Sequence, residues 1–396
     1  MRLLFLSSEF PPGPGGIGTH AHQLARRLTV MGWEVVMVTP QSYTSKDEVE
    51  SFNRLQPFNV VSLRQLPFAP VKAVYRWVVA SRLIGKWRPQ VILASGDREV
   101  YLGARLARHY RLPWVAVEHG RIPPRWERPL KRRSFREANA VVCVSRYTAQ
   151  KLLDLGVNPR HLRVIPNGAD IKRLSESDER DHSVLLETMG LSGKRILLTV
   201  GSVTDRKGQD VVIRALPRVL QRMPNTHYLM AGLPAKQKEF TKIAEELGVA
   251  GHVHFLGHVD NRTLSDLFNS CDLFIMTSRH TADEFEGFGI ASVEAALCGK
   301  PSIVSMNSGL AEAIVDGETG LGVPEEDEAA TADKVLSLLE DEGRRQTMGN
   351  AARLHALTEQ TWEKRAAEYD SLFRDILRAA DLPSGYGTHE KAAARS

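Results

Sequence analysis

The chain has 396 residues and a formal net charge of +5, with 42% hydrophobic and 25% charged residues. This balance is typical of a soluble globular protein, and the length suffices for two domains that each bury a core. No run approaches the roughly 20 apolar residues of a membrane span. The N-terminal apolar stretch is short and leads into Glu9 and a proline loop, so it predicts a first strand and not a signal peptide.

The cysteines are few and uneven in number. Cys143, Cys271 and Cys298 each lie in an apolar context, and none has the spacing of a metal site. We therefore expect reduced, packed thiols in a cytoplasmic protein.

Charge is unevenly divided along the chain. Residues 1–170 hold 26 Lys and Arg against 12 Asp and Glu, a balance of +14, whereas the remainder holds 26 against 35, a balance of −9. Such asymmetry predicts that the first half meets something acidic, such as a phospholipid surface or a phosphate-bearing acceptor. The alternative is an ordinary solvated basic face.

Apolar, strand-like runs alternate with helical stretches along the chain. In order they fall at 2–8, 34–40, 59–65, 90–95, 114–119, 140–145, 196–202, 227–232, 252–257, 272–278 and 301–306. Short apolar strands that alternate with helices indicate parallel sheets covered by helices on both faces. The fold class is therefore α/β, with two Rossmann-like domains.

A polar, charged stretch near 171–192 separates the two halves. We expect an N-terminal domain over 1–175, a C-terminal domain over 190–355, a helix over 356–380 that crosses back to the first domain, and a disordered tail over 382–396. The late helix has an apolar stripe at helical spacing. The stripe consists of Trp362, Ala366, Tyr369, Leu372, Phe373 and Ile376.

The loop after the first strand is rich in glycine. Gly13, Gly15 and Gly18 satisfy the G-x-G-x-x-G pattern, which allows close approach to a diphosphate and would suggest an NAD enzyme. The prolines make the loop longer and stiffer than a dinucleotide turn, and the next strand ends at 38–40 with no acidic residue to hold a ribose. The glycines either approach a phosphate or sugar or form a plain strand-to-helix turn.

Two further loops carry charged groups at strand ends. Arg206 and Lys207 follow a strand that ends at Gly201, where two cations could neutralise a diphosphate. In the segment 286–301, Glu286 precedes a Gly-Phe-Gly loop and Glu294 lies inside the helix that follows. The amides of Phe288, Gly289 and Ile290 would point at an anion, although carboxylates also simply favour the positive end of a helix.

Basic residues gather with aromatics in the first half, at 73–89 and 123–138. A basic amphipathic face with aromatics indicates a membrane surface or the acceptor side, and the alternative is a solvated helix. No nucleic-acid recognition motif accompanies the charge. The residues of the candidate acceptor or membrane face are Arg125, Arg128, Lys131, Arg132 and Arg133.

Taken in order, these motifs resemble glycosyltransferase family 4, of the GT-B fold, from Met1 to about Leu377. The matching positions are Gly15 and Gly16, His119 in VEHG, Ser145 in SRYT, the IPNGAD segment that ends at Asp170, the Lys207-Gly208 pair, and Glu286 with Glu294. One position departs from the family: many members have an arginine where this chain has Ser202, and Arg206 is expected to supply the missing charge.

The resemblance implies a retaining, metal-independent transferase with His119, Lys207 and Glu286 as catalytic residues. It implies that Glu294 binds ribose and that Glu286 binds hydroxyls of the transferred sugar. Attack by the acceptor on the leaving-group face is favoured, because no nucleophilic carboxylate is evident on the first domain. The implied donor-binding residues are Gly15, Gly16, Ser202, Arg206, Lys207, Glu286, Gly287, Phe288, Gly289, Ile290 and Glu294.

The expected reaction moves a hexose or N-acetylhexosamine from a nucleotide-diphosphate sugar to a hydroxyl acceptor, lipid-linked or phosphate-bearing, in cell-envelope glycan or glycolipid synthesis. UDP is favoured over GDP, and the enzyme is expected on the inner face of the cell membrane as a peripheral protein. Rival interpretations are a nucleotide-sugar 2-epimerase, an NAD-dependent oxidoreductase and a non-catalytic nucleotide-sugar binding protein. The sequence sets neither the donor sugar, the acceptor nor the oligomeric state.

Overall fold

The structure, a computed structural model, describes residues 1–157, 161–171 and 181–381. The predicted tail over 382–396 and part of the predicted linker lie outside the described residues. The predicted strands of both halves are present, and the α/β fold class is confirmed.

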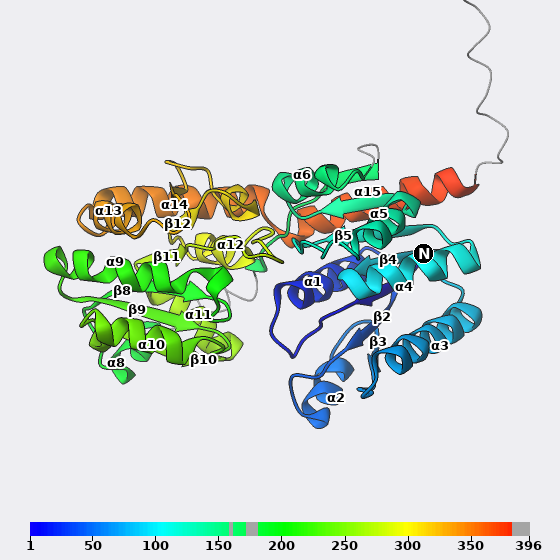
Figure 1. The fold of residues 1–396 in the computed structure, drawn as a ribbon, viewed down its shortest axis with the longest axis horizontal. Helices are drawn as coiled ribbons and strands as arrows, with labels where there is room; N and C mark the ends of the chain where they lie inside the picture. The colour runs from blue at the N-terminus through cyan, green and yellow to red at the C-terminus, as the bar shows by residue number, and fades with distance from the viewer. Residues whose placement is uncertain (158–160, 172–180, 382–396) are drawn as a thin grey trace, which may run out of the picture. The chain divides into compact units, whose positions relative to one another are not determined.

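The first sheet has seven strands in the order β3-β2-β1-β4-β5-β6-β7 (Figure 1). From β3 to β5 each strand pairs in parallel with its neighbour. The interior strand β1 is buried after its first residue, which explains why its sequence is continuously apolar from Leu3 to Leu6 rather than alternating. The strands are β1 (Arg2–Ser7), β2 (Glu34–Pro40), β3 (Asn59–Leu63), β4 (Val91–Ser95), β5 (Trp114–Glu118), β6 (Ala140–Cys143) and β7 (Leu162–Val164).

Helices connect the strands of this sheet, as parallel pairing requires. The predicted helix over 73–89 is present and begins slightly earlier, because a proline stands at its first turn. The helices are α1 (Gly16–Val30), α2 (Lys46–Arg54), α3 (Ala69–Trp87), α4 (Asp97–Tyr110), α5 (Arg128–Glu137) and α6 (Arg146–Asp154).

The second sheet has six strands in the order β10-β9-β8-β11-β12-β13, and every neighbouring pair is parallel. Its order runs outward from β8 in one direction and from β11 in the other, so β8 and β11 flank the topological switch point. Ligands in such folds bind outside the carboxyl ends of the strands at that point. The strands are β8 (Arg195–Val200), β9 (Thr226–Ala231), β10 (Val253–Gly257), β11 (Leu273–Met276), β12 (Ser302–Ser305) and β13 (Gly320–Val323).

One face of the second sheet packs against α9 and α13 around a buried apolar core that includes Leu197, Tyr228 and Ile275. The two helices carry matching apolar stripes, with Leu216 of α9 and Val335 of α13 both buried in that core. The helices of this half are α8 (Ser183–Thr188), α9 (Gln209–Arg222), α10 (Gln237–Glu246), α11 (Asn261–Ser270), α12 (Ile290–Leu297), α13 (Glu328–Leu339) and α14 (Glu342–Glu359).

The described chain packs as two compact units. The first holds residues 1–117 and 134–141 together with the chain from Ala366 onward, and the second holds 118–133 and 142–365. The division of the sequence at 175–190 stays a prediction.

The last helix, α15 (Trp362–Asp381), continues into the first unit from Ala366. Within that unit, the Tyr369 hydroxyl lies 3.2 Å from His20 Nε2, and Trp33 Nε1 donates to Asp370 Oδ1 at 2.8 Å. The apolar stripe predicted for this helix is buried at every position except the half-buried Leu372.

Candidate functional site

Charged groups from two loops of the second unit meet at the carboxyl ends of β8 and β11. After β8 the chain turns at Gly201 and forms a short 3-10 helix, η2 (Asp205–Lys207), before α9 begins. A Cβ atom at Gly208 would lie 2.0 Å from the Thr277 carbonyl oxygen, so only glycine lets this loop approach the end of β11. The two loops are therefore locked together at the switch point.

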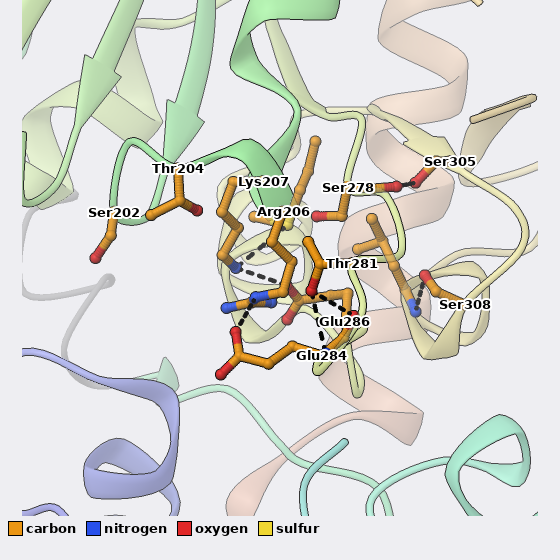
Figure 2. A network of polar contacts seen from close by, with 12 residues as sticks. Ser202, Thr204, Arg206, Lys207, Ser278, Thr281, Glu284, Glu286, Ser305 and Ser308 are labelled. Carbon is orange, nitrogen blue, oxygen red and sulfur yellow. Dashed lines mark hydrogen bonds and ion pairs between the residues drawn. The ribbon is translucent and has the colours of Figure 1, made fainter. Parts of the chain in front are cut away.

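Glu286 lies between two cations. Its Oε2 atom accepts from Arg206 Nη1 at 2.5 Å and from Lys207 Nζ at 2.8 Å, and Arg206 Nε lies 3.1 Å from Glu284 Oε2. Figure 2 shows Arg206 and Lys207 reaching from the β8 loop toward these two glutamates. The sequence predicted Arg206, Lys207 and Glu286 as site residues, and the structure brings the three side chains together.

The electrostatics of this cluster keep Glu286 ionised. Burial alone would raise the pKa of its carboxyl, but the adjacent Lys207 and Arg206 charges outweigh burial and hold the pKa at about 2. The same carboxylate raises the pKa of Arg206, which burial alone would lower. At neutral pH Glu286 is therefore a fixed negative charge and not a proton donor, while burial lowers the pKa of the adjacent Lys207.

The glycine loop between Glu286 and α12 is packed from both sides. A Cβ atom at Gly287 would lie 2.0 Å from the His119 carbonyl oxygen, and Gly289 has a φ of +85° where α12 begins. Phe288 is buried, and Glu294 is buried one turn into the helix. The loop therefore presents the first turn of α12, whose amides lack intrahelical partners by geometry, at the strand ends.

A second segment, 118–122, supports this loop. Phe285 donates its amide to the Gly120 carbonyl at 3.2 Å, and the Ile122 amide donates to the Asp283 carbonyl at 2.7 Å. This pairing places the backbone of half-buried His119 beside Gly287, in the same unit as Glu286.

The segment 118–122 is fixed by a buried ion pair. Lys131 Nζ lies 2.5 Å from Glu118 Oε2 and also donates to the Arg121 carbonyl at 3.0 Å. The other oxygen of Glu118 accepts the amides of Gly120 and Arg121. Both carboxylate oxygens are thus engaged, and Glu118 is held as a structural counter-ion.

The prediction that Lys131 belongs to an exposed basic face is wrong, because its side chain is only 1% exposed. Its helical position turns it inward toward Glu118, which the run of neighbouring basic residues conceals. Arg125, Arg132 and Arg133 are exposed, and half-buried Arg128 donates to the Pro123 carbonyl. The other four predicted residues thus remain at or near the surface.

The remaining predicted residues lie in different places. Ser202 stands apart from the ion pairs, and its carbonyl accepts from Gln209 Nε2 at 3.1 Å (Figure 2). Gly15 and Gly16 belong to the first unit, where Gly15 has a φ of +147° and packs against Glu9. The involvement of these two glycines with a donor stays a prediction.

Sequence reasoning missed a network beside the site. The Tyr147 hydroxyl lies 2.5 Å from His280 Nε2, and His280 Nδ1 lies 2.8 Å from Glu325 Oε1. The ring of Phe285 packs against both Tyr147 and His280. Helix α6 and two loops far apart in sequence contribute to this network, so no local pattern could reveal it.

Sequence reasoning also missed Glu284. The sequence did contain a signal for it, because residues two apart in an extended segment point to the same side, which places Glu284 with Glu286.

Among the described residues, no cluster of three or more His, Cys, Asp and Glu side chains could hold a metal ion.

Comparison with known proteins gives the class of this chain. Residues 189–355 match the family model of glycosyl transferases group 1, and residues 14–173 match the model of glycosyltransferase family 4. Together the two ranges cover most of the sequence. The chain belongs to glycosyltransferase family 4, whose members with the GT-B fold have two Rossmann-like domains.

Curated relatives span nearly the whole chain. A glycogen synthase of Mycobacterium tuberculosis is 28% identical and covers 97% of both chains. A GDP-mannose-dependent alpha-(1-6)-phosphatidylinositol monomannoside mannosyltransferase of Mycolicibacterium smegmatis is also 28% identical, over 93% of this chain and 97% of its own.

Among solved structures, Anabaena Alr3699/HepE in complex with UDP and glucose matches with a TM-score of 0.79. It is 22% identical and covers 96% of this chain and 100% of its own, a likeness that concerns the fold. The fold, the two family models and the curated relatives together define a nucleotide-sugar glycosyltransferase.

Proposed function

We propose that this chain transfers a hexose or N-acetylhexosamine, with retention of anomeric configuration, from a nucleotide-diphosphate sugar to a hydroxyl acceptor that is lipid-linked or phosphate-bearing. The observation that carries the proposal is the convergence of Arg206 and Lys207 on Glu286 at the switch point of the second sheet. Two cations at that point suit a diphosphate, and a carboxylate between them suits sugar hydroxyls.

The roles of the individual residues follow from this arrangement. Lys207 and Arg206, with the first-turn amides of α12, would stabilise the negative charge that develops on the departing nucleoside diphosphate. Because two fixed cations supply that charge, we propose that transfer proceeds without a metal ion. Glu286 would orient the sugar and Glu294 the ribose, while His119 would contact the sugar.

Retention requires either two inversions through a covalent intermediate or attack on the same face as the leaving group. Glu118 is bound by Lys131 and by two backbone amides, so it is poorly placed to act as a nucleophile. We propose same-face attack: the acceptor oxygen bonds to the anomeric carbon as the bond to the phosphate oxygen breaks, and the acceptor proton passes to that phosphate oxygen. Trapping a sugar covalently bound to the enzyme would contradict this mechanism.

The donor nucleotide is tested by thermal shift with UDP-, GDP- and ADP-sugars. We propose UDP as the first candidate and GDP as the second, since the mannosyltransferase relatives are named for GDP-mannose. Stabilisation by a nucleotide sugar supports the proposal, whereas stabilisation by NAD alone would contradict it. Turnover of the donor without an acceptor would favour the 2-epimerase alternative.

An exposed apolar stripe on the first unit supports a lipid-linked acceptor. On and just before α3, the side chains of Phe68, Val71, Val74 and Val78 are exposed by 67%, 49%, 64% and 36%. Their spacing of three to four residues puts them on one helical face, in the half of the chain with the basic excess. In the second unit, Trp126 is 79% exposed beside the exposed Arg125.

These two features favour a peripheral attachment to the inner face of the cell membrane. The named acceptor of the mannosyltransferase relatives is a phosphatidylinositol mannoside, which also favours a lipid-linked acceptor here. Among the described helices, none has the length and hydropathy to span a bilayer.

Co-sedimentation with vesicles tests the attachment. Wild-type protein should bind vesicles that contain phosphatidylglycerol, and the double variant Phe68→Ser/Val74→Ser should bind them at least about 10-fold more weakly, since burial of even one apolar side chain contributes about 1.5–3 kcal/mol. Leu55→Ser serves as the control, because Leu55 is 82% exposed and lies outside the stripe. Equal binding by the stripe variant and the control would contradict a role for α3.

A further inference from the structure

The Arg206 guanidinium holds two carboxylates that differ in burial. Its Nη1 atom binds Glu286 at 2.5 Å, and the Glu286 side chain is 11% exposed. Its Nε atom binds Glu284 at 3.1 Å, and the Glu284 side chain is 56% exposed. Figure 2 shows the two glutamates approaching Arg206 from the same loop. One partner is therefore built into the site, and the other lies at its solvent side.

Hydrogen bonds hold the backbone of Glu284, whereas its exposed side chain is held by the ion pair with Arg206. The Glu284 amide donates to Thr281 Oγ1 at 3.1 Å, and the Thr281 amide donates to the Glu284 carbonyl at 2.9 Å. On the other side of the pair, the Arg206 carbonyl accepts the Arg279 amide at 2.8 Å. The Glu284 carboxylate can thus leave Arg206 by rotation of its own side chain, with both backbones unchanged.

The formal charges of the four side chains of this cluster cancel. Arg206 and Lys207 carry two positive charges, and Glu284 and Glu286 carry two negative charges. A diphosphate that entered this set would gain little net attraction while both carboxylates stayed in place. Glu286 is held by two cations and is buried, so the exposed Glu284 is the carboxylate that an incoming anion can replace.

We propose that Glu284 is a displaceable counter-ion of Arg206, which the diphosphate of the nucleotide replaces and which thereby sets the affinity for nucleoside diphosphates. This inference rests on the proposed function, since it takes the Arg206–Lys207 pair as the diphosphate site. Glu284 would leave the affinity for nucleoside monophosphates unaffected, because a single phosphate that occupies Lys207 leaves Arg206 paired with Glu284.

The test is Glu284→Gln, with calorimetric titration of UDP, GDP, UMP and GMP. Because an exposed ion pair of this kind is worth up to about 1 kcal/mol, the variant should bind the preferred nucleoside diphosphate roughly 2- to 5-fold more tightly than wild type. Binding of the monophosphates should stay unchanged. Glu284→Ala, which truncates the side chain instead of neutralising it, should bind the nucleoside diphosphate more tightly by the same factor. Thermal unfolding should confirm that both variants fold.

The matched control is Glu326→Gln. Glu326 is 64% exposed and lies 3.0 Å from Arg279 Nη1, and Arg279 also holds the less exposed Asp210, so the geometry repeats that of Glu284 on Arg206. The control variant should bind every nucleotide like wild type. Unchanged or weaker diphosphate binding by both Glu284 variants would overturn the proposal, as would equal tightening by Glu326→Gln. If wild type binds no nucleoside diphosphate, the proposed function itself fails.

Discussion

Two buried Lys–Glu pairs lie in the second unit, and they differ in what surrounds them. Lys131 and Glu118 are 1% and 5% exposed, and backbone groups of the same segment satisfy the remaining atoms of both side chains. Lys207 and Glu286 are 13% and 11% exposed, and the second cation, Arg206, shares the Glu286 oxygen. The first pair is closed on itself, whereas the second shares Arg206 with the exposed Glu284, which we propose a ligand replaces.

The comparison shows that burial of an ion pair does not by itself indicate a functional site. A buried charge must be compensated, and either backbone groups or further charges can do so. Where backbone groups compensate it, the pair stabilises a loop. Where surplus charges at a strand end compensate it, the pair can bind a charged substrate.

Removing one partner of the Lys131–Glu118 pair should have the largest effect on stability. Lys131→Met leaves Glu118 buried without its cation, so we expect a loss of roughly 3–5 kcal/mol in the free energy of unfolding, measured by urea denaturation. The double variant Glu118→Gln/Lys131→Met should recover part of this loss, because glutamine keeps an acceptor for the amides of Gly120 and Arg121. A single variant as stable as wild type would show that the pair is not structural.

Lys207→Met should separate function from stability. Arg206 still compensates Glu286, so the loss of stability should be smaller than for Lys131→Met. Transfer activity should fall roughly 10²- to 10³-fold in kcat, as expected when a group that stabilises the leaving group is removed. Lys236→Met, at a half-buried lysine paired with Glu239 and Asp205, should retain wild-type activity. Near-normal turnover by Lys207→Met would place the leaving-group site elsewhere.

The pH dependence of stability should reveal the ionisation of Glu286 in the Lys207–Glu286 pair. Because the Lys207 and Arg206 charges outweigh burial and hold the pKa of Glu286 at about 2, against an ordinary value of 4.5, its carboxylate stabilises the fold above pH 4.5. That contribution, ~3 kcal/mol when fully titrated, is lost as the pH falls toward 2. Unfolding at pH 6 and pH 3 should therefore show a shallower acid loss for Glu286→Gln than for wild type. Parallel curves would contradict the ionised state of Glu286.

A histidine cluster at the edge of the second sheet should give a smaller effect at higher pH. Burial, and then the neighbouring His252 and His254, lower the pKa of His227 to about 4 from its ordinary value of 6.5. The unfolded chain thus binds the proton first, and the fold loses stability as the pH falls from 6.5 toward 4. In thermal unfolding, His227→Asn should slightly reduce the loss of stability between pH 6.5 and pH 4. His258→Asn, at an exposed histidine, should leave that loss unchanged.

Much of the fold could be predicted from the sequence, because fully apolar strands of five or more residues are distinctive. The short strands β7 and β13 were missed: β7 has three residues, two of them exposed, and β13 contains two glycines, so neither forms an apolar run.

The charged cluster of Arg206, Lys207 and Glu286 could also be predicted from the sequence, because each of these residues follows a recognisable strand end. Lys131 was assigned to the surface because helical orientation, not composition, decides which member of a basic run turns inward. The Tyr147–His280–Glu325 network joins α6 to two distant loops, and composition and spacing do not contain those contacts. The spacing of Glu284 from Glu286 places both side chains on one side of an extended segment, but the pairing of Glu284 with Arg206 is a contact between distant loops.

The most direct test of the diphosphate site is calorimetric binding of UDP and GDP to wild type, Lys207→Met and Lys236→Met. We predict that wild type and Lys236→Met bind one of the two nucleotides equally, and that Lys207→Met binds it roughly 10- to 100-fold more weakly, the loss expected for one charge-assisted hydrogen bond. Equal affinity of Lys207→Met and wild type, or no binding of either nucleotide by wild type, would contradict the account.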